Sequence, residues 1–202
     1  MKKKIIITII VLALLAGGGY AAWQNPSVRS FIESRLPKAP DTNALYEQSL
    51  VDALKYKSEG DSGDPQGYKK AIREYKKAAR YSNSWFPYLN AGNVYRLMKE
   101  YADAENSYKQ GLARQPGEVS LYLAFVELYR YDLEKDESVV IEVYERGLTQ
   151  IPRNPNLRSS YGAYLRDIGR KADAIKQYGI LASEFPEYPQ YAEELKRLKE
   201  GR

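Results

Sequence analysis

This 202-residue chain contains no cysteine and no histidine. The side chains that could bind a metal ion are therefore mostly those with oxygen atoms. This composition excludes thiol nucleophiles, imidazole metal ligands and the commonest general base. The loop EGDSGDPQG at residues 59–67 could hold a Ca²⁺ ion through its carboxylate oxygens. It does not follow the EF-hand pattern, however, and turn-forming residues alone explain its composition. The sequence therefore predicts no metal site and no cofactor.

Catalytic motifs are also missing from the chain. No glycine-rich phosphate loop, Walker motif or G-x-S-x-G sequence occurs. No nucleophile with a neighbouring base can be named, so we expect no catalytic residue and no enzyme activity. The net charge of +5 includes the three lysines at residues 2–4, and the rest of the chain is close to neutral. We therefore expect no nucleic-acid partner, which would need a clustered basic face.

The N-terminus has the pattern of a membrane anchor. Residues 1–4 form a basic tail, and no charged residue occurs from Ile5 to Ser27. As a helix, residues 5–23 span roughly 28 Å, about the thickness of the apolar core of a bilayer. Tyr20 and Trp23 stand where interfacial aromatic residues are common. The pattern predicts a single-pass protein whose basic tail is cytoplasmic and whose body lies outside the cytoplasm.

A cleaved signal peptide is the alternative interpretation of the same segment. Its basic, apolar and small-residue regions are all present, and Gly19 and Ala21 could precede a cleavage site. The apolar stretch continues as far as Trp23, which favours the uncleaved anchor. Cleavage would make the protein secreted. Residues 24–42 then form a juxtamembrane linker, broken by Pro37 and Pro40.

The remainder of the chain is built from an internal repeat. Four tyrosines recur at separations of 33, 36 and 34 residues: Tyr75, Tyr108, Tyr144 and Tyr178. A smaller apolar residue stands four positions before each of them: Ala71, Ala104, Val140 and Ala174. Residues four apart share one face of a helix, so the pair predicts a tight helix–helix contact with a ring beside it. A period of about 34 is typical of a helical repeat array.

This pattern resembles the tetratricopeptide repeat family. The clearest copy, residues 85–118, has the family's spaced positions as Tyr88, Ala91-Gly92, Tyr95, Tyr101, Ala104, Tyr108, Gly111, Leu112 and Pro116. The copies span about residues 43–84, 85–118, 119–154 and 155–187, and the third has about two extra residues in its inner turn. The resemblance implies an all-α protein: a right-handed helix-turn-helix solenoid of four repeats. Residues 188–202 supply a capping helix, so we expect nine helices after the linker.

The resemblance also implies a peptide-binding groove. In the family, positions 2, 5, 6, 9, 12 and 13 of each first helix line the concave face of the array. Counting from Trp85, Val119 and Pro155, we expect a groove lined by Phe86, Leu89, Asn90, Asn93, Arg96, Leu97, Leu123, Glu127, Arg130, Tyr131 and Arg166. Apolar residues at these positions could receive side chains of a peptide, and the asparagines could bind its backbone.

Three of these residues, Arg96, Arg130 and Arg166, share one repeat position. Each guanidinium could grip a carboxylate with two hydrogen bonds, so one hypothesis is an extended, acidic peptide as partner. The other hypothesis is that the arginines pair with local acids such as Glu127 and Asp167.

The function that follows is an interaction protein. We expect a membrane-anchored scaffold or assembly factor of the cell envelope that binds a protein or peptide partner. The alternative is an extracytoplasmic chaperone-like protein associated with secretion or envelope biogenesis. The sequence does not decide whether the chain forms homo-oligomers.

Overall fold

The computed structural model describes residues 26–27, 30 and 41–201. The predicted basic tail and membrane helix, and most of the linker, lie outside these residues and stay predictions. No helix among the described residues combines the length and apolar character needed to cross a membrane. Residues from Thr42 onward form one compact unit, which carries all the structure discussed below.

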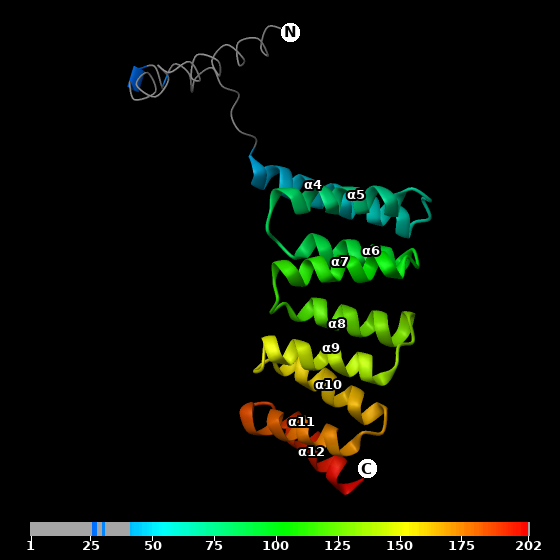
Figure 1. Ribbon diagram of the computed structural model, residues 1–202, viewed down its shortest axis with the longest axis vertical. Helices are drawn as coiled ribbons and strands as arrows, with labels where there is room; N and C mark the ends of the chain where they lie inside the picture. Colours follow the sequence, from blue (N-terminus) through cyan, green and yellow to red (C-terminus); the bar gives the residue numbers. More distant parts are fainter. Residues whose placement is uncertain (1–25, 28–29, 31–40, 202) are drawn as a thin grey trace. The chain divides into compact units, whose positions relative to one another are not determined.

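Nine α-helices and no strand occur in residues 41–201, which confirms the predicted all-helical class and helix count. They are α4 (Thr42–Asp61), α5 (Gly67–Tyr81), α6 (Phe86–Leu97), α7 (Tyr101–Arg114), α8 (Val119–Glu127), α9 (Glu137–Gln150), α10 (Pro155–Asp167), α11 (Lys171–Glu184) and α12 (Pro189–Glu200). The first eight form four pairs, each a first helix followed by a second helix. Figure 1 shows the pairs following one another from α4 to α11, and α12 packs on α11.

Each second helix contributes the predicted small residue and tyrosine to a continuous core. The four tyrosines Tyr75, Tyr108, Tyr144 and Tyr178 are buried, as are the residues four positions before them. Burial of each large ring removes roughly 150–250 Å² from water. At about 25 cal/mol per Å² of apolar surface, these rings are among the largest single contributions to folding.

Glycine at the eighth position of two first helices makes room for these rings. A Cβ atom at Gly92 would collide with the ring of Tyr108, and one at Gly162 would lie 2.9 Å from the ring of Tyr178. The second helix of the pair can therefore approach closely enough for its tyrosine ring to contact the first helix at the glycine. Close packing of this kind leaves no room for an added methyl group.

The extra residues of the third repeat form a short π-helix, η2 (Leu128–Asp132), directly after α8. Its wide turn is closed by a hydrogen bond of 2.9 Å from the amide of Leu133 to the carbonyl of Leu128. A second bond of 2.8 Å joins the amide of Lys135 to the carbonyl of Tyr129. Inserted residues are often absorbed as a single π turn, and this one sets the position of Asp132.

We predict that Gly92→Ala destabilises the fold by about 1–3 kcal/mol, because the new methyl group must displace the Tyr108 ring. Gly179→Ala is the matched control, since a Cβ there meets nothing within 4 Å. It should instead stabilise α11 by about 0.5–1 kcal/mol. Urea unfolding followed by circular dichroism measures both changes. Equal effects of the two substitutions would contradict the packing role of Gly92.

Candidate functional site

Exposed apolar side chains gather at the groove positions of the first helices. Six large apolar side chains are exposed in the described residues: Val51 (59%), Leu54 (52%), Phe86 (37%), Leu97 (52%), Tyr131 (63%) and Tyr188 (45%). Phe86, Leu97 and Tyr131 are predicted groove residues. Val51 and Leu54 stand at positions 9 and 12 of α4, counted from Asn43, so they extend the same face by one repeat. Among these six residues, only Tyr188 does not stand at a groove position.

The other uncharged groove residues are already engaged with the protein. Leu89 and Leu123 are half-buried and pack against the core. The Asn90 side chain donates a hydrogen bond of 2.9 Å from Nδ2 to the carbonyl of Phe86. Asn93 accepts one of 2.7 Å at Oδ1 from the hydroxyl of Tyr108. Each amide therefore keeps one polar atom that has no partner within the described residues.

The three arginines are held by carboxylates of the next repeat or of the capping helix. Arg96 binds Glu127 through Nη1 at 2.7 Å and Asp132 of η2 through Nε at 2.6 Å. Arg96 is the most enclosed of the three, with 20% of its side chain exposed. Two carboxylates of the protein therefore already bind the guanidinium that we expected to be available to a ligand.

The same arrangement recurs further along the array. Arg130 binds Asp167 at 3.0 Å, and its guanidinium lies over the rings of Tyr131 and Tyr164, 5.0 and 5.1 Å from their centres. Arg166 binds Asp167 at 3.0 Å and Glu194 of α12 at 2.8 Å. The arginines thus form a ladder of ion pairs along the first helices, and the structure matches the second hypothesis, pairing with local acids.

The ion pairs shift the pKa values of Arg96 and Asp167. Burial alone would lower the pKa of Arg96, but the hydrogen bonds to Glu127 and Asp132 outweigh it and hold the pKa above its ordinary value. Partial burial opposes the charge of Asp167, yet hydrogen bonds from Arg130 and Arg166 lower its pKa below the ordinary 3.8. Both groups therefore stay charged at neutral pH, as the ion pairs of the ladder require.

One buried tyrosine hydroxyl lacks a partner. The hydroxyl of Tyr75, on a fully buried side chain, has no hydrogen bond within the described residues. The equivalent tyrosine of the second repeat, Tyr108, donates to Asn93 at position 9 of its own first helix. An unpaired buried hydroxyl costs about 1–3 kcal/mol.

The acidic loop at residues 59–67 uses its carboxylates within the protein. Asp61 accepts hydrogen bonds from Lys57 at 2.7 Å and from the hydroxyl of Tyr68 at 2.9 Å. Asp64 accepts one from Lys70 at 3.0 Å and one from the amide of Gln66 at 2.9 Å. No group of three or more metal-binding side chains converges in the described part of the chain. The segment thus comprises the end of α4, a hydrogen-bonded turn at residues 62–66 and the start of α5, rather than one loop.

No family model matches the chain, and no curated protein sequence matches it. Solved structures do. MamA is 18% identical with a TM-score of 0.54, over 79% of this chain and 83% of that one. A tetratricopeptide repeat protein from Parabacteroides merdae is 14% identical with a TM-score of 0.56, over 78% and 61%. PilW, a type IV pilus biogenesis factor, is 16% identical with a TM-score of 0.50, over 77% and 69%.

These structures define the fold class. At such identities the likeness concerns the fold alone, and it shows that residues 41–201 adopt the tetratricopeptide repeat fold. The fold expected from the repeat pattern is thereby confirmed.

Sequence reasoning missed four residues that shape this surface: Val51, Leu54, Asp132 and Glu194. Val51 and Leu54 could have been found by extending the repeat frame to the first copy. Asp132 and Glu194 carry no such signal, because one lies on the inserted π turn and the other on the capping helix.

We predict that the ladder loses stability in acid through Asp167. Because its pKa is lowered in the folded state, its contribution is complete above pH 3.8 and disappears as the pH falls through the folded value. Unfolding free energies measured in urea between pH 5 and pH 2 should fall more steeply for the wild type than for Asp167→Asn. Glu193→Gln, on an exposed side chain of α12, is the control and should follow the wild type. Parallel curves for wild type and Asp167→Asn would refute the role of Asp167.

Proposed function

We propose that this protein is a membrane-anchored scaffold that binds a segment of a protein partner along the first helices of its repeats. The fold supports a protein partner, because repeat solenoids present extended surfaces suited to protein recognition. The observation that carries the proposal is the gathering of five of the six exposed large apolar side chains at groove positions. Exposed apolar patches of this kind mark interaction sites on soluble domains.

The ion pairs limit which groups of a partner can bind at the groove. The carboxylates of Glu127, Asp132, Asp167 and Glu194 already bind the arginine ladder. A carboxylate of the partner would have to displace one of them, which yields little net gain. We therefore assign recognition to apolar anchors that contact Val51, Leu54, Phe86, Leu97 and Tyr131. The remaining amide atoms of Asn90 and Asn93 bind the peptide backbone of the partner.

We predict that Leu97→Asp weakens partner binding, because it replaces an exposed apolar anchor of the groove with a charge. The measurement is co-purification of partner proteins from detergent-solubilised membranes, quantified by mass spectrometry, together with urea unfolding of each variant.

Tyr188→Asp is the matched control, because Tyr188 is an exposed apolar residue outside the groove positions. It should leave the set of partners unchanged. Undiminished recovery with Leu97→Asp would refute the groove as the binding site. Recovery of many weakly held proteins rather than one would favour the chaperone-like alternative.

Anchoring through residues 5–23 is part of the same proposal and has its own test. The chain contains no cysteine, so Lys176→Cys and Lys3→Cys each introduce a unique label site. In intact cells, a membrane-impermeant maleimide should reach Lys176→Cys on α11 but not Lys3→Cys. The protein should also remain in the membrane fraction after carbonate extraction. A mature protein that starts near residue 22 would instead establish the cleaved signal peptide.

A further inference from the structure

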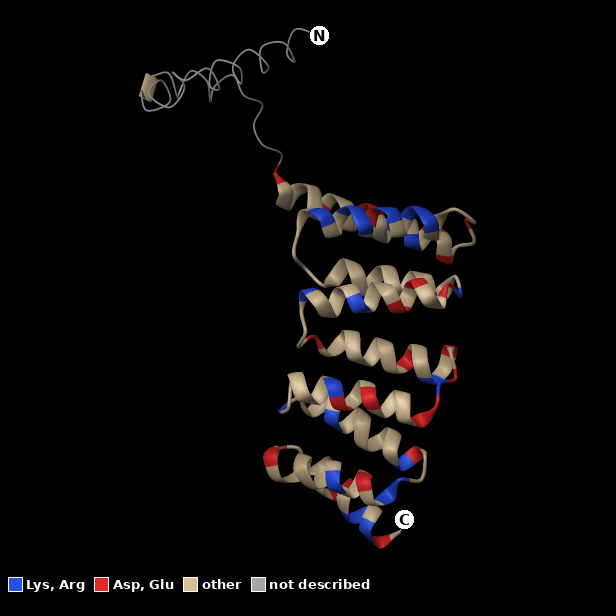
Figure 2. Cartoon of the chain, in the orientation of Figure 1, with Lys and Arg blue, Asp and Glu red and all other residues tan. Residues whose placement is uncertain are grey.

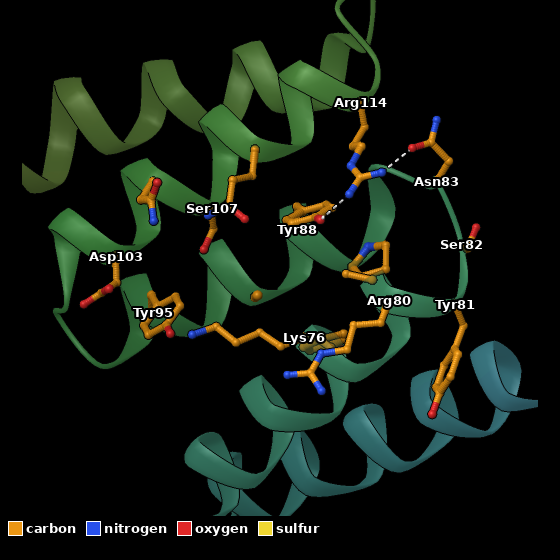
Figure 3. Close-up of a pocket in the computed structure, with 16 residues that line it drawn as sticks. Lys76, Arg80, Tyr81, Ser82, Asn83, Tyr88, Tyr95, Asp103, Ser107 and Arg114 are labelled. Atoms are coloured by element: carbon orange, nitrogen blue, oxygen red, sulfur yellow. Dashed lines mark hydrogen bonds between the residues drawn. The ribbon is translucent and has the colours of Figure 1, made fainter. Parts of the chain in front are cut away.

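An open cleft of about 850 Å³ lies between α5, α6 and α7 (Figure 3). Its wall on α6 consists of Pro87, Tyr88, Ala91 and Tyr95. At 100° per residue, these positions cluster on one side of the helix, whereas the groove positions of α6 cluster on the other. The cleft and the groove therefore use opposite faces of the same helix, and they share no lining residue on α6.

Small residues from all three helices line the cleft: Ala79, Ala91 and Ser107. Ala91 stands where the third and fourth repeats have Phe125 and Tyr161. The equivalent space one repeat further on, between α7, α8 and α9, contains Phe125 and has a volume of only about 110 Å³. Ala79 and Ser107 likewise stand where that space has Leu112 and Val143, so three smaller side chains distinguish the open cleft from the nearly filled one.

One wall of the cleft is strongly cationic. Lys69, Arg73, Lys76 and Arg80 follow one another at i, i+4, i+7 and i+11, which is one face of α5, and all four are exposed. Figure 2 shows the basic residues gathered along this helix. Within the described residues none of the four has an ion pair, whereas Lys70 and Lys77 on the same helix are paired with acids. Lys76 and Arg80 line the cleft itself.

The opposite wall adds a third cation and several amides. Arg114 of α7 donates hydrogen bonds to the neutral groups Asn83 and Tyr88, so its charge has no carboxylate partner in residues 41–201. Lys76 lies 5.4 Å from the centre of the Tyr95 ring, and Arg114 lies 5.7 Å from that of Tyr88. Figure 3 shows these cations on two sides of the tyrosines. Asp103 is the one acid among the lining residues.

We propose that this cationic cleft binds an acidic, extended segment of a protein, independently of the groove. Carboxylates of the segment pair with Lys76, Arg80 and Arg114, which have no acid of their own to displace. The amides of Asn106 and Gln110 bind its backbone, since each can donate and accept. A peptide fits the concave shape, whereas a flat lipid surface would reach only the outer residues of the α5 stripe.

The test uses the full-length chain in detergent and a fluorescein-labelled decapeptide of alternating Glu and Asp, with fluorescence anisotropy as the readout. Binding should weaken steeply as NaCl is raised, because the pairs are solvent-exposed. The double variant Lys76→Gln/Arg80→Gln should weaken binding at least tenfold. Ala91→Phe should do the same by filling the cleft as Phe125 does, with an unchanged circular dichroism spectrum.

Two controls separate this site from others. Arg146→Gln removes an exposed cation from the equivalent filled cleft and should leave binding unchanged. Leu97→Asp, which alters the groove, should also leave it unchanged. The proposal is overturned if the wild type does not bind the peptide, or if the double variant binds it equally well. It is also overturned if only phosphatidylglycerol vesicles bind, or if the double variant abolishes only self-association.

Discussion

The buried tyrosine of each second helix, packed beside a small residue four positions earlier, is the contact on which the whole array depends. Tyr108 lies against Gly92 so closely that a single methyl group cannot be added between them. Because a buried tyrosine recurs in every pair, each first helix is held with one face toward the core. Its remaining surface is left for ion pairs and ligands, and the positions of both proposed sites follow from that constraint.

The two faces of α6 show how one helix can serve two surfaces. On one face, Phe86 and Leu97 stay exposed while Arg96 is tied to the third repeat by Glu127 and Asp132. On the other, Ala91 leaves a cleft whose cations have no acid of their own. The contrast is one of charge balance. The arginine ladder is neutralised by acids of the protein and joins neighbouring repeats, whereas the cleft presents an uncompensated positive field that favours an acidic ligand.

Much of this organisation could be read from the chain before its structure. The period of Tyr75, Tyr108, Tyr144 and Tyr178 predicts the repeat count, because a helix pair with this pattern cannot bury its apolar face alone. The same frame places Arg96, Arg130 and Arg166 at equivalent positions. It cannot say whether those arginines meet a ligand or the protein itself, since both outcomes use the same residue type at the same spacing.

The sequence by itself determined the all-helical class, the number of helices in residues 41–201 and the positions that form the core, because each is governed by local periodicity and burial. Only the tertiary structure decided what the charged and polar groups do. Asp132 reaches Arg96 because two inserted residues are absorbed as a π turn, and Glu194 reaches Arg166 because the capping helix packs on α11. The cleft beside Ala91 likewise needs three helices brought together by the fold, in addition to the small side chains that line it.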